Sequence, residues 1–344
     1  MADERFLVIR LGSLGDIVHT LPGVAALRGS FPGARIDWVV ERKWAGLLRG
    51  NPILNEVVEL ERGSSGAMRA CVRRLRAGGY SCAIDFQGLY KSALLAFFSG
   101  AARRIGFSRR FAREGGAALF YTSRVSPLPE HIVEQNLALA ESAGVRRTAC
   151  HFALSVSAEA QANTDRRLAS LGLREFFVIS PGGGWRSKCW PAERYGELYR
   201  ELAQRYGWRG VLNFGPGETG LAEAVRRAAA PEHPVLLETD IPQLMALLRR
   251  AKIVVAGDTG PLHLAVGLGT PVVGLYGPTD PKRNGPYCAD DVVVCNARDA
   301  ETTYKRGNEY SASMLSIAVE QVLSAIEQRL ARVAPQRAEP AGTA

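Results

Sequence analysis

Residues 254–280 constrain the fold most strongly, because they predict a complete strand–turn–helix–strand unit. An apolar run at residues 253–256 ends at Gly-Asp-Thr-Gly, and a helix of small residues is predicted at 261–268. A second apolar run at 271–276 ends at Gly-Pro-Thr-Asp. Two strands joined by a helix form a parallel βαβ unit. Both turns then lie at the carboxyl ends of strands, where open α/β sheets bind ligands.

The first of these turns has the features of a phosphate site. It opens a helix, and the free N–H groups of Thr259 and Gly260 add to the positive end of the helix dipole. Pro261 suits the first helical turn, where a missing N–H costs nothing. His263 lies on the helix face that carries Thr259, which makes it a candidate ligand contact, although a single helix histidine is more often a core or surface group.

Alternating strands and helices continue over nearly all of the chain. Apolar runs predict strands at residues 5–11, 36–40, 57–60, 80–86, 103–107, 176–180, 210–214, 235–238 and 292–295. Helical patterns lie between them, at residues 17–28, 43–49, 68–77, 91–98, 130–143, 158–171, 192–206, 241–250 and 312–333. This alternation predicts an α/β fold built from doubly wound parallel sheets.

The length of 344 residues favours two such domains over one. The α/β rhythm pauses at residues 144–158 and then restarts, which predicts an N-terminal domain over 1–155 and a C-terminal domain over 156–333. Residues 334–344 have a composition typical of disorder. Two Rossmann-like halves in tandem are expected to face a central cleft.

The net charge of +9 is unevenly distributed. Residues 1–150 hold 21 of the 43 Lys and Arg but only 13 of the 34 Asp and Glu. The basic excess is either a solvated face or a contact for an acidic partner, such as an anionic lipid or a phosphorylated glycan. The absence of a basic helix with interleaved aromatic residues argues against nucleic acid. The densest basic cluster consists of Arg103, Arg104, Arg109, Arg110 and Arg113.

Cysteine spacing and hydropathy predict a cytoplasmic protein. The six cysteines form no close pair and no metal-type spacing, which fits reduced thiols and no zinc site. The N-terminus lacks a signal-peptide pattern. The longest apolar patch, near residues 93–98, is too short to span a bilayer.

Three polar residues in the first half are candidates for a site, each with an alternative. Asp16 follows the first predicted strand and is either the N-cap of the next helix, which local sequence favours, or a carboxylate placed to take a proton. Lys91 follows the strand at 80–86 and faces either a ligand or solvent. His131 is either a ligand contact or a surface histidine.

Residues 181–191 form a second candidate phosphate site. Three glycines beside Lys188 offer bare N–H groups and one mobile positive charge, although the spacing is not that of a Walker A loop. The glycines could equally shape a turn, and Lys188 could be a surface residue. Glu218 follows the next strand, where it either accepts hydrogen bonds from a ribose diol or begins a helix.

Three stretches of the chain resemble glycosyltransferase family 9, the ADP-heptose:lipopolysaccharide heptosyltransferases: residues 10–22, 181–191, and 257–263 with 276–281. The resemblance implies a GT-B architecture, with the acceptor in the N-terminal domain and the sugar nucleotide in the C-terminal one. It implies inverting heptose transfer from ADP-heptose as co-substrate, with no bound metal or other cofactor. Residues 10–22, together with 85–92, are most similar to heptosyltransferase I, which adds the first heptose to Kdo.

The same resemblance implies roles for individual residues. Asp16 would be the general base, and Lys188 would neutralise charge on the leaving ADP together with the amides of Thr259 and Gly260. Glu218 would bind the ribose. The other implied donor-binding residues are Ser13, Gly183, Gly184, Thr239, Asp258, His263, Thr279 and Asp280. The implied acceptor-binding residues are Lys91, Arg109, Arg110 and His131.

The implied partner is an acidic lipopolysaccharide precursor, Kdo-lipid A, reached by peripheral, salt-sensitive contact with the cytoplasmic face of the inner membrane. Within the family, a heptosyltransferase II-like enzyme is the alternative. A sugar-nucleotide epimerase or hydrolase on the same fold would need no acceptor. A non-catalytic binding protein would not depend on Asp16.

Overall fold

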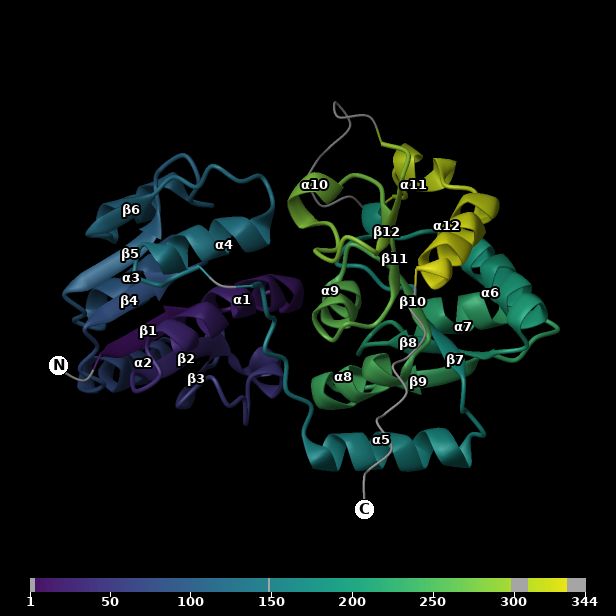
Figure 1. Ribbon diagram of the computed structural model, residues 1–344, viewed down its shortest axis with the longest axis horizontal. Coiled ribbons are helices and arrows are strands. Elements are labelled where there is room, and N and C mark those ends of the chain that lie inside the picture. The colour runs from purple at the N-terminus through teal and green to yellow at the C-terminus, as the bar shows by residue number, and fades with distance from the viewer. Residues whose placement is uncertain (1–3, 148, 298–308, 333–344) are drawn as a thin grey trace, which may run out of the picture. The chain divides into compact units, whose positions relative to one another are not determined.

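The computed structural model describes residues 4–147, 149–297 and 309–332. These residues divide into two compact units, one built mainly from residues up to 167 and the other mainly from residues 168 onward. Each unit contains a six-stranded parallel sheet with helices (Figure 1). The predicted α/β class, with a doubly wound sheet in each half, is confirmed.

The N-terminal sheet has the strand order β3–β2–β1–β4–β5–β6. Its strands are β1 (Arg5–Ile9), β2 (Arg35–Glu41), β3 (Glu56–Leu60), β4 (Cys82–Asp85), β5 (Arg103–Phe107) and β6 (Ser123–Val125). The helices are α1 (Leu14–Ser30), α2 (Ser65–Ala77), α3 (Tyr90–Phe98) and α4 (Ile132–Glu141), with 3₁₀ helices η1 (Arg42–Leu47) and η2 (Gly115–Phe120). Strand order reverses between β1 and β4, so the loops after these strands lie at a topological switch point.

The C-terminal sheet repeats this plan, with the strand order β12–β11–β10–β7–β8–β9. Its strands are β7 (Phe176–Ser180), β8 (Arg209–Phe214), β9 (Val235–Glu238), β10 (Ile253–Gly257), β11 (Val272–Tyr276) and β12 (Val292–Cys295). The remaining helices of the chain are α5 (Ala158–Ser170), η3 (Arg186–Lys188), α6 (Ala192–Tyr206), α7 (Thr219–Ala228), α8 (Ile241–Arg250), α9 (Gly260–Gly267), α10 (Pro281–Asn284), α11 (Ala312–Ser316) and α12 (Val319–Ala331). Here the switch point lies between β7 and β10.

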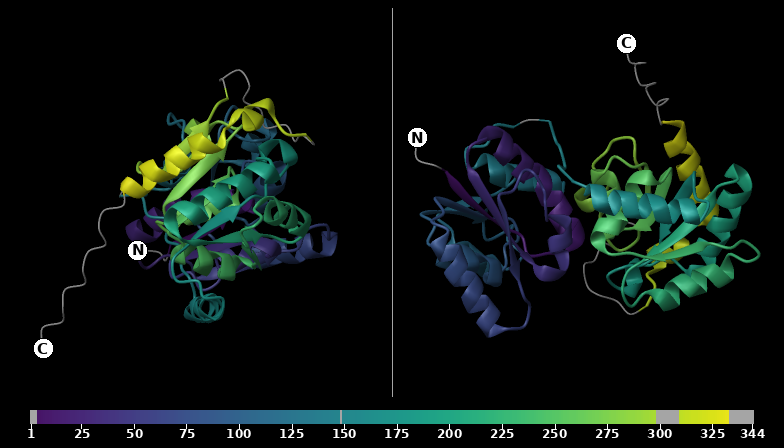
Figure 2. Two further views of the ribbon diagram at one scale, coloured as in Figure 1. Left: turned by 90° about the vertical axis from the view of Figure 1, so that its right-hand side faces the viewer. Right: turned by 90° about the horizontal axis from the view of Figure 1, so that it is seen from below.

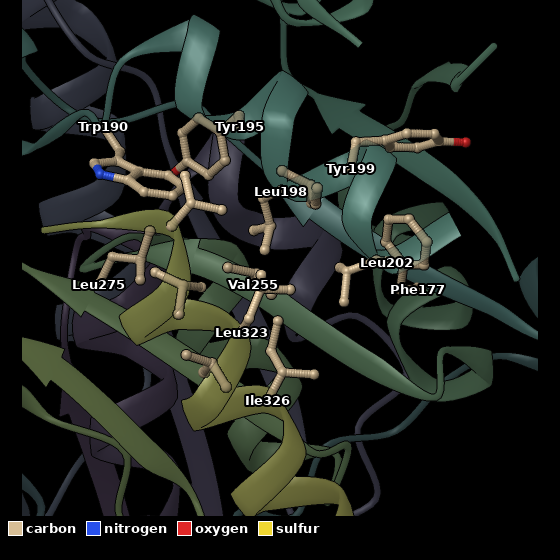
Figure 3. Close-up of a cluster of buried hydrophobic side chains, with 14 of the residues drawn as sticks. Phe177, Trp190, Tyr195, Leu198, Tyr199, Leu202, Val255, Leu275, Leu323 and Ile326 are labelled. Carbon is tan, nitrogen blue, oxygen red and sulfur yellow. The ribbon is translucent and has the colours of Figure 1, made fainter. Parts of the chain in front are cut away.

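Both sheets are covered by helices, as parallel sheets require. Every residue of β7, β10 and β11 is buried, which explains their uninterrupted apolar sequences. In the N-terminal unit α1 packs against α4, and α2 lies beside α3 (Figure 2). In the C-terminal unit, α6 and α12 bury aromatic and aliphatic side chains against β7, β10 and β11 (Figure 3).

The structure differs from the predicted elements at several places. Residues 42–47 form a 3₁₀ helix where an α-helix was expected, and η2 with β6 was not anticipated. The helix expected at 312–333 is confirmed over α11 and α12 but is not continuous, because the chain leaves helical geometry at Ile317. There the carbonyl of buried Ile317 accepts a hydrogen bond from Trp190 Nε1 at 3.1 Å, instead of one within a helix. The expectation for residues 334–344 lies outside the described residues.

Candidate functional site

Asp16 belongs to a polar cluster that follows β1. Its Oδ1 atom lies 2.6 Å from Nη2 of Arg10, a buried guanidinium. Its Oδ2 atom accepts hydrogen bonds from the backbone N–H and the hydroxyl of Ser13, at 3.1 and 3.0 Å. Arg113 lies 3.8 Å from the same oxygen. Two guanidinium groups and a hydroxyl therefore surround a carboxylate whose side chain is 27% exposed.

The N-cap alternative for Asp16 is wrong, because helix α1 begins three residues earlier than the apolar stripe indicated. Ser13 is the N-cap residue, and Asp16 occupies the third helical position, from which it accepts the Ser13 N–H. This is the carboxylate half of a capping box. The capping hydrogen bond uses Oδ2 and leaves Oδ1 to pair with Arg10. One carboxylate therefore both caps α1 and forms an ion pair.

The loop after β4 holds the loop after β1 in place. Gln87 Oε1 accepts the Leu11 N–H at 2.7 Å, and the Arg10 guanidinium also donates to the Phe86 carbonyl. Buried Asp85 anchors this loop by accepting the Tyr121 hydroxyl at 2.7 Å and the Gln87 N–H at 2.8 Å. Burial raises the pKa of Asp85, partly opposed by these hydrogen bonds. The loops at the switch point of the N-terminal sheet thus hold Arg10, and the Arg10 guanidinium in turn positions the Asp16 carboxylate.

The charges around Asp16 keep it ionised. Burial raises the pKa of its carboxyl, but the Arg10 and Arg113 guanidiniums together with the Ser13 hydrogen bond outweigh this effect. The resulting pKa lies well below the ordinary aspartate value. Asp16 is therefore a carboxylate at every physiological pH, able to accept a proton but held by strong partners.

A second charged cluster joins the loops after β7 and β10. Lys188 Nζ lies 2.5 Å from Asp258 Oδ2, and His263 Nε2 lies 3.0 Å from Asp258 Oδ1. Lys188 also sits 4.4 Å from the centroid of the Trp185 ring. The Lys188 side chain is only 11% exposed and that of Asp258 6%, so the surface-residue alternative for Lys188 is wrong. The three candidate residues form one buried ionic unit at the switch point.

Asp258 is the electrostatic centre of this unit. Burial raises the pKa of its carboxyl, while the His263 hydrogen bond and the Lys188 charge lower it more. The net pKa lies well below the ordinary value. Asp258 is therefore ionised in the folded protein, and it fixes both the ammonium of Lys188 and the imidazole of His263.

We expect Asp258→Asn to lower the free energy of unfolding by about 3 kcal/mol at pH 7, because it leaves the buried Lys188 charge without its partner. A depressed pKa gives a contribution that is complete above the unfolded-state value of about 4 and is lost as the pH falls below it. Urea denaturation should therefore show a constant difference from wild type between pH 5 and 8 that narrows below pH 4. Exposed Asp290→Asn is the matched control; a difference that stays constant below pH 4 contradicts this account.

Glycines of the loop after β7 permit a close approach by Glu218. A Cβ atom on Gly182 would collide with the Glu218 carboxylate, which accepts the Gly215 N–H at 2.9 Å. A Cβ atom on Gly183 would lie 2.9 Å from Cys189 Sγ, whereas a Cβ atom on Gly184 would have no neighbouring atom within 4 Å. Glu218 is the N-cap residue of α7. The structure therefore brings Glu218 to the glycine loop and leaves Gly184 open to a ligand.

Three buried hydroxyls lie at or just after the strand ends of this unit. Ser180 is the last residue of β7, Ser187 lies in η3, and Thr279 follows β11. Their oxygens have no hydrogen-bond partner among the described residues. Buried polar atoms are normally satisfied. These hydroxyls are therefore able to form hydrogen bonds with a polar ligand.

The turn that opens α9 has the predicted geometry. Thr259 is the N-cap residue, and Pro261 lies in the first helical turn. The first N–H groups of a helix have no acceptor within it. Elsewhere in the unit, Thr239 accepts a hydrogen bond from Asn213 Nδ2 at 2.8 Å, and partly buried Asp280 precedes α10.

The candidate acceptor-binding residues are dispersed over the N-terminal unit. The Nζ atom of Lys91 lies 3.6 Å from Oε1 of Glu41 on β2. Arg109 and Arg110 are exposed after β5, and the Arg110 guanidinium lies 6.0 Å from the Phe111 ring. His131 is the N-cap residue of α4, where its Nδ1 accepts the Val133 N–H at 3.2 Å. The described ion pairs of Asp16 are with two other arginines, Arg10 and Arg113.

Sequence reasoning missed residues that the tertiary structure places around the candidates. Arg10 and Gln87 hold the Asp16 turn, and Arg113 approaches Asp16 although it was grouped only with the basic cluster. Ser180 and Ser187 were also missed. One signal was available, because a charged residue directly after a buried apolar strand, as Arg10 is, rarely stays buried without a partner.

The described residues include no group of three or more His, Cys, Asp or Glu side chains arranged to hold a metal ion. Among the helices of the described ranges, none combines the length and hydrophobicity required to cross a membrane.

The chain is similar to known glycosyltransferases over most of its length. The model of glycosyltransferase family 9 (heptosyltransferase) matches residues 68–313. Lipopolysaccharide heptosyltransferase 1 of Pseudomonas aeruginosa is 31% identical over 82% of this chain and 81% of its own. Among solved structures, Escherichia coli ADP-heptose heptosyltransferase II is 25% identical, covering 95% of this chain and 99% of its own, with a TM-score of 0.81.

A second E. coli enzyme, heptosyltransferase WaaC solved with ADP-2-deoxy-2-fluoro heptose, is 28% identical over 94% of this chain and 99% of its own, with a TM-score of 0.75. These neighbours share the two-sheet architecture described above, so the GT-B prediction is confirmed. Because the family model covers more than two thirds of the chain and a relative of 31% identity spans most of it, the protein belongs to glycosyltransferase family 9 and is a glycosyltransferase.

Proposed function

We propose that the enzyme transfers heptose, with inversion, from ADP-heptose to the Kdo region of the lipopolysaccharide inner core. The observation that carries this proposal is the Lys188–Asp258–His263 unit beside the glycine loop and the N-terminus of α9. A fixed ammonium and a set of bare N–H groups suit a nucleoside diphosphate. The heptosyltransferases to which the chain is similar support heptose as the sugar.

In this proposal residues 156–333 hold the donor. Lys188 and the amides of Thr259, Gly260, Gly183 and Gly184 contact the diphosphate. The likeness to family 9 supports the other proposed donor contacts: Glu218 to the ribose, Thr239 near the adenine, and Ser13, Asp258, His263, Thr279 and Asp280 to the sugar or phosphate. Charge on the leaving ADP is neutralised by side chains and amides, without a metal ion or other cofactor.

Asp16 is the proposed general base. It takes the proton of an acceptor hydroxyl, whose oxygen bonds to the anomeric carbon of the heptose as the bond to ADP breaks. The hydroxyl becomes acidic as that new bond forms, so a carboxylate of low pKa suffices. Arg10 supports this role by holding Oδ1, while Oδ2 accepts hydrogen bonds from Ser13 and lies 3.8 Å from Arg113.

Residues 1–155 are the proposed acceptor domain, with Lys91, Arg109, Arg110 and His131 as acceptor contacts. The basic excess of residues 1–150 supports an acidic acceptor such as Kdo-lipid A. Because that acceptor is a membrane lipid, we also propose peripheral attachment at the cytoplasmic face of the inner membrane.

The test is ADP release from ADP-heptose with and without Kdo-lipid A. Acceptor-dependent release is expected and would establish first-heptose transfer. Release that requires an acceptor already carrying one heptose would favour the heptosyltransferase II type. Release without any acceptor would favour hydrolysis, and a changed sugar nucleotide without release would favour epimerisation.

We expect the double variant Arg109→Glu, Arg110→Glu to raise the KM for the acceptor by about 10-fold. Two exposed positive charges that attract the acidic acceptor become two negative charges that repel it. Binding of ADP, measured by calorimetry, should be unchanged. The pair Arg226→Glu, Arg227→Glu on α7 makes the same change of charge elsewhere and serves as the control. A weakened ADP affinity in the Arg109→Glu, Arg110→Glu variant would indicate that these arginines bind the donor and not the acceptor.

A further inference from the structure

An apolar groove of about 770 Å³ runs between α2 and α3 of the N-terminal unit. It lies apart from the Asp16 cluster, which occupies the loops after β1 and β4. Both helices contribute apolar side chains to its walls, so a hydrocarbon could enter without desolvating polar groups. Its apolar lining consists of Met68, Val72, Leu94, Leu95 and Phe98.

Cations border the same groove. Arg69 and Arg73 line it from successive turns of α2, and both side chains are exposed. Neither forms an ion pair within the described parts of the chain, whereas neighbouring Arg74 pairs with Glu56. Two positive charges without acidic partners beside an apolar opening match a ligand that carries both an anionic group and a hydrocarbon chain.

Aromatic side chains extend the apolar surface beyond the groove. Phe97 and Phe98 are 47% and 44% exposed, and their rings lie 5.4 Å apart. The Arg104 guanidinium lies 5.5 Å from the Phe97 ring. Exposed aromatic rings among arginines are typical of helices that lie in the interface of an anionic membrane.

We propose that the α2–α3 groove is the site at which the enzyme docks on an anionic phospholipid bilayer. One acyl chain enters between Val72 and Phe98, and the lipid phosphate is held by Arg69 and Arg73. This inference rests on the peripheral membrane contact of the proposed function and assigns it to a surface that does not include Asp16, although Lys91, a proposed acceptor contact, also lines the groove. A peptide helix would fill the groove but would not need a phosphate partner.

The test is sedimentation of the full chain with vesicles of phosphatidylcholine, with or without phosphatidylglycerol and free of any glycolipid. Wild type should bind the phosphatidylglycerol vesicles. Phe98→Asp and the double variant Arg69→Glu, Arg73→Glu should each weaken binding by at least about 10-fold. In high salt, wild type should bind more weakly but not lose binding, because acyl insertion is not screened.

Matched controls separate this site from general charge and hydrophobicity. Leu128→Asp removes a fully exposed apolar residue outside the groove, and Arg226→Glu with Arg227→Glu reverses the same number of charges. Both controls should bind vesicles like wild type. Vesicle binding that is absent in wild type, or equal in the groove variants and their controls, would overturn the proposal.

Turnover separates this inference from the proposed function. With a de-acylated, water-soluble acceptor, the groove variants should keep wild-type kcat and KM. If wild type binds vesicles through the groove but transfers no heptose, the proposed function fails and the docking site stands. If groove variants bind vesicles normally but lose turnover only with acylated acceptor, the occupant is the acceptor's own chain and the bilayer proposal is wrong.

Discussion

Replacing Asp16 by asparagine is expected to lower kcat by about 10²- to 10⁴-fold, the range typical of losing a general base. Asparagine keeps the shape of the side chain but cannot take the proton of the acceptor hydroxyl. ADP should bind with unchanged affinity, because the proposed donor contacts of Lys188 and Thr259 remain. The measurements are steady-state release of ADP and calorimetric ADP binding.

Two controls make the Asp16 result interpretable. The substitution also removes the partner of buried Arg10, so thermal unfolding must show that the variant is folded at the assay temperature. Ser13→Ala removes a hydrogen bond to the carboxylate but leaves the carboxylate in place, and it should cost less than 10-fold. Because the pKa of Asp16 is depressed, its ionisation should add no acid limb to the wild-type rate between pH 5 and 8. A folded Asp16→Asn enzyme with near-normal kcat would rule out the base.

Replacing Lys188 by alanine is expected to weaken ADP binding by about 2–5 kcal/mol, or roughly 30-fold or more, and to lower kcat as well. The substitution removes the proposed positive contact to the diphosphate. It also leaves the buried Asp258 carboxylate, 2.5 Å from the Lys188 ammonium in the native structure, to repel the anionic ligand. Calorimetry with ADP measures the first effect, and turnover at saturating donor measures the second.

A double variant separates the loss of attraction by the Lys188 ammonium from the repulsion by the Asp258 carboxylate. Lys188→Ala combined with Asp258→Asn should bind ADP more tightly than Lys188→Ala alone, because the uncompensated carboxylate is gone. Lys252→Ala, which breaks an exposed pair with Glu175, is the matched control and should leave ADP affinity unchanged. Unaltered ADP affinity in Lys188→Ala would remove Lys188 from the donor site.

Local sequence patterns suffice for strands that are buried on both faces. The apolar runs of β7, β10 and β11 predicted these strands within one or two residues, because strands buried on both faces have uninterrupted apolar sequences. The glycine and proline signals after β10 correctly predicted the start of α9. The pattern failed only at the break within residues 312–333, because helical periodicity continues through Ile317 while the structure pairs the Ile317 carbonyl with a tryptophan that is distant in sequence.

By itself, the sequence determined the α/β class, the order of the elements and the turns that carry polar residues, since periodicity and turn residues are local properties. The tertiary structure alone decided the partners of those residues. Lys188 meets Asp258 across 70 positions, and Arg10 meets the carbonyl of Phe86 across 76. Each contact exists because strand order reverses at a switch point, which places the ends of sequence-distant strands side by side. Because the fold buries most of the Lys188 side chain, its ammonium pairs with the Asp258 carboxylate instead of facing solvent.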